Sequence, residues 1–481
     1  MRAQSTRNGV SSRLVPRTRS PLKDEVLDKL AESANVAQFV SYGPDLTQRF
    51  SRIIGYESNC RFPSVSGALE ALMNRSSRQS INIRSFHAQI PKRSEFLYGI
   101  QLVSDAESHL RRLAQNGFHT IANETIDVND GGVSGVSYGG VVEFAPGDTP
   151  KCVEKPGTAV LPSPMAATML ETVYSFRPTL DWDESLRVEF SIHPLKCGLR
   201  HAHTIIWEIE EFEAAEVPCT IRWPNHFSRL LGDKTFGLLV AHTLGFRIPA
   251  TTVISRAVSA FSFGLRTGTG EFWIRTSPRE PKPGFYPTEF GWRDPFSLIS
   301  GHNITGDFVA SILSQESVDM HYSGALVTTA DGTPYLEGVT GRGDEFMQGR
   351  RAPESLPPQV VSAVLKAFEN LKSRLGPIRF EWVFDSEKLW IIQLHCGGNT
   401  STELVIYPGL PTSFKSFNVE DGIEALRELI PEVKRTGQGI LLLGRIGITS
   451  HLGDLLRRAK IPSRIAIPSE PSAPENLRLQ F

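Results

Sequence analysis

Four polar residues between positions 234 and 393 of this 481-residue chain have types and spacings that suit phosphate and magnesium binding. Lys234 stands in a turn directly before a helical stretch, so its ammonium group would lie at a helix N-terminus, where phosphate binds. Arg275, in a strand-like run, is a second suitable cation. Glu381 and Gln393 lie on two strand-like runs joined by a short turn, and a hairpin would bring their oxygens together. These residues predict a site for Mg²⁺ and the phosphates of ATP.

Short motifs around these residues follow one another in a recognisable order. They run from about residue 225 to residue 395 and are Leu231–Leu238, Leu244–Pro249, Trp273–Ser277, Ser314–Val318, Ser323–Thr328, 337–349, Phe380–Trp382 and Leu389–Gln393. In this order the segment resembles the ATP-binding domain of the phosphoenolpyruvate synthase and pyruvate phosphate dikinase family. The resemblance implies an ATP-grasp-like fold and a phosphotransferase that uses ATP and Mg²⁺.

The resemblance also implies a role for each matching residue. Lys234 and Arg275 would hold the phosphates and act in catalysis, while Glu381 and Gln393 would ligate Mg²⁺. The hinge strand beside adenine and the glycine-rich stretch supply the remaining nucleotide-binding candidates, which are Gln315, Glu316, Val318 and Glu337.

Two positions depart from the family pattern. In the lysine turn, Asp233 replaces the family's second glycine. The family has an arginine two residues beyond the glutamine, whereas here His395 occupies that place and becomes a catalytic candidate. Arginine is always charged and binds anions through two N–H groups, but histidine titrates near neutral pH. The change argues against the family's usual phosphoryl acceptor more than against ATP binding.

A second resemblance lies near the C-terminus. The run Gly447–Asp454, followed by Lys460-Ile461-Pro462, resembles the phosphohistidine motif of the same superfamily's swivelling domain. This resemblance implies that His451 accepts phosphate from ATP and carries it to a second site. An imidazole at a helix start suits this role, because free N–H groups can hold the phosphoryl oxygens. The run Gly437–Gly439 could provide a hinge for the movement.

Strand-like and helical stretches alternate along the chain and predict an α/β (α+β) protein. The clearest strands are Ser80–Arg84, Thr120–Asn123, Val141–Phe144, Val188–Ile192, Thr204–Ile209, Glu271–Arg275, Leu336–Val339, Arg379–Phe384 and Leu389–Leu394. The clearest helices are 24–34, Ala106–Gln115, Thr235–Leu244, Gln359–Arg374 and Val419–Leu429.

The two halves share motifs at a nearly constant offset, which predicts an internal duplication. Arg84 matches Arg275 at 275 − 84 = 191, Glu124 matches Glu316 at 316 − 124 = 192, and Glu189 matches Glu381 at 381 − 189 = 192. The first copy looks degenerate: Tyr42–Pro44 stands where the lysine turn is expected, and Glu208 stands for Gln393. The predicted domains are a disordered basic tail (1–23), a degenerate first repeat (24–220), an ATP-binding second repeat (221–400), and a linker with a shortened swivelling segment (401–481).

Composition limits the partners. The formal net charge of −1 gives no electrostatic footprint for nucleic acid. No apolar run approaches the ~20 residues of a membrane-spanning helix, and the Arg- and Ser-rich start lacks the apolar core of a secretory signal, although a transit peptide remains an alternative. Five scattered cysteines predict reduced thiols and a cytoplasmic protein.

The leading hypothesis is therefore ATP- and Mg²⁺-dependent phosphoryl transfer, through His451, to a small molecule or a partner protein. Two alternatives stay open. One is an ATP-grasp ligase that activates a carboxylate as an acyl phosphate, and the other is a nucleotide sensor without catalysis. The sequence does not specify the acceptor, the pathway or the oligomeric state.

Overall fold

The computed structural model describes residues 23–90, 94–148, 155–180, 183–213, 217, 219–280, 286, 288–301, 309–348, 350–397, 405–444 and 446–466. The predicted basic tail, apart from Lys23, lies outside the described residues, as does Cys152. The chain divides into two compact units. The first comprises Met1–Ile126 with Lys196–Glu208, and the second comprises Asp127–Leu195 with Ile209–Phe481.

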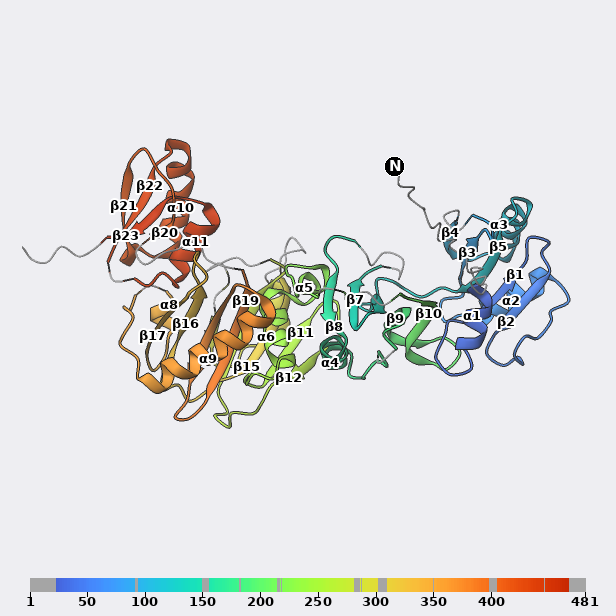
Figure 1. Cartoon of the computed structure of the whole chain (residues 1–481), viewed down its shortest axis with the longest axis horizontal. Coiled ribbons are helices and arrows are strands. Elements are labelled where there is room, and N and C mark those ends of the chain that lie inside the picture. The colour runs from blue at the N-terminus through green and yellow to red at the C-terminus, as the bar shows by residue number, and fades with distance from the viewer. Residues whose placement is uncertain are drawn as a thin grey trace, which may run out of the picture. The chain divides into compact units, whose positions relative to one another are not determined.

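The first unit is built on a five-stranded antiparallel sheet (Figure 1). In spatial order its strands are β2 (Gln48–Arg52), β1 (Phe39–Tyr42), β5 (His119–Glu124), β3 (Ile81–Phe86) and β4 (Phe96–Ile100). Its helices are α1 (Lys23–Leu30), α2 (Val65–Arg75) and α3 (Val103–Gln115). Apolar residues of α2 and α3 form one core with those of the sheet, including Leu69, Leu72 and Leu110.

A second five-stranded sheet follows along the chain. The two of its strands that come last in the sequence contain residues of both units. The spatial order is β10 (Ala202–Glu211), β9 (Leu186–Cys197), β6 (Val133–Tyr138), β7 (Val141–Pro146) and β8 (Ala159–Pro162). Helix α4 (Ser163–Tyr174) connects β8 to β9 and is buried on several sides, because apolar residues surround most of its circumference.

Two further antiparallel sheets form the body of the second unit. The order of the third sheet is β12 (Phe261–Phe263), β11 (Thr251–Ser255), β15 (Val309–Glu316), β13 (Phe272–Pro278) and β14 (Thr288–Phe290). The order of the fourth is β17 (Pro334–Thr340), β16 (Tyr322–Thr328), β18 (Ile378–Phe384) and β19 (Leu389–Cys396).

Helices accompany these two sheets. They are α5 (His226–Leu231), α6 (Asp233–Thr243), α7 (Pro295–Gly301), α8 (Asp344–Met347) and α9 (Pro358–Leu375). Helix α9 buries Val360, Val364 and Phe368, which recur at the spacing of one helix face, and it ends at Gly376 with φ 74°. Helices α6 and α9 and the sheets share one core, which contains Phe236, Phe368 and Trp382.

The C-terminal segment has a small core of its own. Its four-stranded sheet has the order β20 (Val405–Tyr407), β23 (Ser463–Ile465), β22 (Gly439–Leu443) and β21 (Phe414–Asn418), with the last three parallel. The other elements are η2 (Val419–Asp421), α10 (Gly422–Thr436) and α11 (His451–Ala459). The run Gly437–Gly439, expected as a hinge, joins α10 to β22 within the C-terminal segment.

The α/β class is confirmed, and so is the internal duplication within it. The order β2-β1-β5-β3-β4 of the first sheet returns as β12-β11-β15-β13-β14, strand for strand along the chain. The order β7-β6-β9-β10 returns as β17-β16-β18-β19, and β8 is an additional edge strand of the first copy. In both copies the crossing from the second to the third of these strands in the chain contains a helix, α4 or α9.

The strand registers repeat as well. Equivalent cross-strand pairs are Ile81–Glu124 with Phe272–Glu316, Gly135–Phe190 with Gly324–Trp382, and Val136–Glu189 with Ala325–Glu381. Since shifting a strand by one residue would turn its side chains to the opposite face, equal registers keep equivalent side chains on equivalent faces. The offsets in the sequence therefore reflect a repeated structure.

Two general expectations can also be compared with the structure. None of the helices in the described ranges is both long and apolar enough to cross a bilayer. The four described cysteines, Cys60, Cys197, Cys219 and Cys396, are free thiols.

Candidate active site

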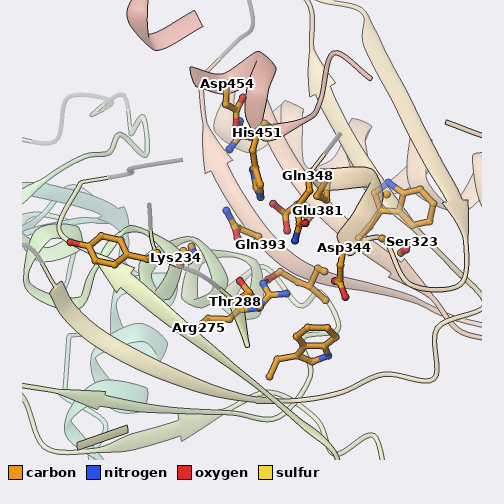
Figure 2. A pocket seen from close by; sticks show the side chains of 18 of the residues that line it. Lys234, Arg275, Thr288, Ser323, Asp344, Gln348, Glu381, Gln393, His451 and Asp454 are labelled. Atoms are coloured by element: carbon orange, nitrogen blue, oxygen red, sulfur yellow. Dashed lines mark hydrogen bonds and ion pairs between the residues drawn. The ribbon is translucent and has the colours of Figure 1, made fainter. Parts of the chain in front are cut away.

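A cavity of about 460 Å³ lies in the second unit, lined by residues of the third and fourth sheets and of the C-terminal segment (Figure 2). Its walls contain six of the ten residues that the sequence singled out, namely Lys234, Arg275, Glu381, Gln393, His395 and His451. These residues are up to 217 positions apart in the chain (451 − 234), so the fold brings them together.

Lys234 enters the cavity from the first turn of α6. This helix lies directly against β19: a Cβ atom at Gly237 would be only 2.0 Å from the carbonyl oxygen of Leu394. The close approach requires glycine and sets Lys234 beside the strand that carries Gln393. Burial, and secondarily the positive charge of Arg275, lower the pKa of Lys234 to about 8.

Arg275 lies on β13 with 8% of its surface exposed. Its Nη1 donates a 2.9 Å hydrogen bond to the carbonyl oxygen of Ile392. Its Nε is buried and has no hydrogen-bond partner among the described residues. A buried guanidinium N–H without an acceptor is costly, so this donor fits an anion that the cavity would receive.

Glu381 and Gln393 are direct cross-strand neighbours on β18 and β19, as the predicted hairpin requires. The next pair is Trp382 with Ile391, so Ile392 is an extra residue in β19, a β-bulge. The bulge leaves the Ile392 carbonyl oxygen available to Arg275, which ties the two sheets together at the site.

The oxygen ligands fit a magnesium–nucleotide complex better than a metal site made by the protein alone. Among the described residues no group of three or more His, Cys, Asp or Glu side chains could hold a metal. Mg²⁺ typically keeps several waters and is bound by one or two carboxylates together with substrate phosphates. Glu381 and Gln393, with Asp344 from the start of α8 in the same cavity wall, match this kind of donor set.

His395 is held in place by two neighbours. Its Nδ1 lies 2.7 Å from Oδ2 of Asp233, and its Nε2 is within hydrogen-bonding distance of the Gln393 amide nitrogen. The aspartate that replaces the second glycine of the lysine turn thus lies directly beside the histidine that replaces the arginine. The two departures from the family pattern form one contact.

His451 is the first residue of α11, and Ser450 caps this helix by accepting a hydrogen bond from the N–H of Gly453. Figure 2 shows its side chain extending toward Glu381 and Gln393. Burial lowers the pKa of His451, while the charges of Glu381 and Asp454 act in the opposite direction. The imidazole is therefore mostly neutral at pH 7, which leaves a ring nitrogen lone pair for nucleophilic attack.

Four predicted nucleotide-binding residues do not line the cavity. Gln315 donates to Oγ1 of Thr251, Glu316 accepts from the N–H groups of Thr267 and Gly268, Val318 packs in a small core, and Glu337 binds the C-terminal segment. All four are buried.

Five charged residues of the cavity wall were missed in the sequence, namely Asp344, Arg350, Arg379, Asp454 and Arg458. Arg379 precedes Glu381 by two positions on one strand, and Asp454 follows His451 by three on one helix, so both share a face with a predicted residue. This spacing could have identified them. Arg379 forms an ion pair with Asp454, which also pairs with Arg457.

The first copy has replaced its site by contacts within the protein. Helix α1 precedes β1 as α6 precedes β11, and it begins at Lys23, so Lys23 rather than the segment Tyr42–Pro44 corresponds to Lys234. Nζ of Lys23 lies 2.8 Å from Oε1 of Glu208, the counterpart of Gln393. An ammonium paired with a buried carboxylate does not present a cation to phosphate.

Comparisons with known proteins add only a distant likeness in fold. No family model matches the chain, and no curated protein matches it. Similar solved structures include D-alanine–D-alanine ligase from Helicobacter pylori, with 12% identity, 34% of this chain and 54% of that chain covered, and a TM-score of 0.23.

A RimK domain ATP-grasp protein from Sphaerobacter thermophilus is also similar, with 16% identity, 35% of this chain and 58% of that chain covered, and a TM-score of 0.22. L-amino acid ligase from Bacillus licheniformis has 14% identity, with 32% of this chain and 37% of that chain covered and a TM-score of 0.21. The chain thus spans little more than half the length of these proteins, or less. With identities and TM-scores this low, the matches assign the chain to no family.

Proposed function

We propose that the cavity binds Mg-ATP and that the chain is an ATP-dependent enzyme of the ATP-grasp type. The proposal is supported by the convergence of two cations, Lys234 and Arg275, on the oxygen ligands Glu381 and Gln393. The buried, unpartnered Nε of Arg275 supplies a donor for a phosphate oxygen. The apolar wall around Trp273 and Phe290 offers room for the adenine ring.

Magnesium would supply charge neutralisation for the phosphates. Glu381, Gln393 and Asp344 would hold it, and Lys234 with Arg275 would orient the phosphate chain, since phosphoryl transfer depends on positioning and electrostatic stabilisation.

We further propose that His451 is the first phosphoryl acceptor. The observation that carries this step is that His451, from a segment far along the chain, lines the same cavity as Lys234 and Glu381. The imidazole lone pair would attack a phosphorus atom of ATP, an N–P bond would form, and the P–O bond to the departing nucleotide would break. The phosphohistidine would then transfer its phosphoryl group to a small molecule or a partner protein.

The test is incubation of the full chain with Mg-ATP labelled at the β- or γ-phosphate. Formation of an acid-labile, base-stable phosphoprotein supports the phosphohistidine, and the labelled position identifies the group transferred. Absence of any phosphoprotein at full occupancy by ATP would contradict it.

An ATP-grasp ligase is the second candidate, favoured by the pairing of His395 with Asp233. The phosphoenolpyruvate synthase resemblance expects an arginine where His395 stands, and the change argues for a different acceptor, such as an external carboxylate. ADP release that requires both a carboxylate and an amine, without labelled protein, would select the ligase. ATP binding without any turnover would select a sensor.

ATP affinity should depend on pH through Lys234. In the protein without ligand, the Lys234 ammonium has a pKa of about 8, and a bound phosphate must raise this pKa. Affinity should therefore be insensitive to this group below its free pKa and fall by up to about tenfold per pH unit above it, with proton uptake on binding. Calorimetry in two buffers of different ionisation enthalpy measures both quantities. Lys234→Arg, which keeps its charge, should flatten the profile; an equally steep decline in that variant would assign the effect to another group.

The chain should bind one Mg-ATP although its fold is duplicated. In the first copy the Lys23–Glu208 ion pair occupies the place of the lysine and the metal ligand. Equilibrium dialysis at saturating ATP should give a stoichiometry near one. Two sites of comparable affinity would show that the first copy is not degenerate.

A further inference from the structure

The buried carboxylate of Glu337 accepts hydrogen bonds from the turn that leads to His451. Glu337 lies on β17 with 6% of its surface exposed. It accepts hydrogen bonds from the N–H of Ile448 at 3.2 Å and from the N–H of Thr449 at 3.0 Å. The hydroxyl of Thr449 donates a third bond. A carboxylate accepts several such bonds, and charge-assisted bonds are the stronger kind.

The shape of the turn matches this carboxylate closely. A Cβ atom at Gly447 would lie 2.5 Å from Oε2 of Glu337, so only glycine leaves room for the oxygen. The Tyr335 side chain also hydrogen-bonds Glu337, and Tyr335 packs against the core of the C-terminal segment. The contact therefore joins β17 to the segment that carries the phosphoryl acceptor.

The hydrogen bonds to Glu337 lie close to His451 in the chain and can therefore affect its position. Thr449 is followed by Ser450, which caps α11, and then by His451, the first residue of the helix. Fixing the backbone at Ile448 and Thr449 fixes where α11 begins, and this sets the direction in which His451 points into the cavity. Glu337 itself does not line the cavity, so its contact with the turn is the direct path by which it would act on His451.

The Arg379–Asp454 ion pair is a further contact between the fourth sheet and α11. Both of its residues line the cavity, so a change there would alter the charge that the substrate meets. Glu337 differs in this respect, because its removal would leave the lining of the cavity intact.

We propose that Glu337 is a positioning residue that seats the Gly447–Thr449 turn and thereby aims His451 at the bound nucleotide. The proposal deepens the proposed function and rests on it for its catalytic consequence. Its structural part, the hold on the turn, is independent of any turnover.

The test is Glu337→Gln, with Glu369→Gln, an exposed change on α9, as the matched control. Four donors face the carboxylate, and the amide group of glutamine would add a donor of its own, so at least one bond is lost. We expect ATP affinity to stay within about twofold, and single-turnover phosphorylation of His451 to fall about tenfold to a hundredfold, the range caused by misplacement of a reacting group. Hydrogen exchange of residues 446–452 should rise.

Two milder variants protect the test against misfolding. Thr449→Val removes only the hydroxyl donor, and Gly447→Ala places a methyl group against the carboxylate. Both should accelerate exchange of the turn and slow labelling while ATP affinity is kept. Two measurements in Glu337→Gln and Thr449→Val can overturn the proposal. They are hydrogen exchange of the turn and carbethoxylation of His451, and the proposal fails if both are unchanged. If the unchanged chain forms no phosphohistidine, exchange and carbethoxylation still decide the hold on the turn, so the two proposals fail separately.

Discussion

His451→Ala should bind Mg-ATP within about twofold of the unchanged chain and take up no acid-labile phosphate, a loss on the order of a thousandfold or more in labelling rate. The imidazole is the nucleophile in the proposed step, and no neighbouring cavity residue replaces it, because Lys234 and Arg275 are needed as cations and His395 is paired with Asp233. Labelling with β- and γ-labelled ATP followed by acid treatment measures the loss.

The matched control is His321→Ala, which removes a histidine whose side chain is 50% exposed and does not line the cavity. It should label normally. His451→Gln, which keeps a polar side chain of similar size, should behave like the alanine variant. Full labelling of either His451 variant would assign the phosphate to another residue, and full turnover without labelling would favour the ligase.

Lys234→Ala and Glu381→Ala should each abolish measurable turnover and weaken Mg-ATP binding strongly. Removing one partner of a buried charge contact typically costs about 2–5 kcal/mol, or roughly 30-fold to several thousandfold in affinity. Lys234→Ala should weaken ATP with or without Mg²⁺, since the ammonium acts on phosphate. Glu381→Ala should weaken binding only when Mg²⁺ is present.

Isothermal calorimetry with and without Mg²⁺ separates these two effects. Lys366→Ala and Glu369→Ala, both exposed on α9, serve as charge-matched controls. Unchanged affinity in both cavity variants would remove the assignment of the cavity to ATP.

Much of the fold could be predicted from the sequence where patterns were strong. The helix expected at Gln359–Arg374 is α9, because its apolar residues follow one face. The strands expected at Arg379–Phe384 and Leu389–Leu394 are β18 and β19. Helix α4 was not expected, because apolar residues on several sides give no clear helical period. The lysine of the first copy was misplaced although a helix was expected at 24–34, because the nearly constant offset of the motifs pointed to Tyr42–Pro44 instead of the start of that helix.

Site residues could be predicted from the sequence where their own side chains line the cavity. Lys234 and Glu381 line it as expected, whereas Glu316 and Glu337 were assigned to nucleotide and instead bind backbone N–H groups of the protein. A glutamate in a motif does not reveal which donors surround it, because those donors come from distant segments. Arg379 was missed although alternation along β18 places it on the face of Glu381.

The extra residue in β19 has a consequence for how far the third and fourth sheets can move apart. Because the bulge at Ile392 offers its carbonyl oxygen to Arg275, separating the two sheets requires breaking this hydrogen bond or rotating about it. The bulge therefore limits how wide the cavity between these sheets can open while the hydrogen bond is kept.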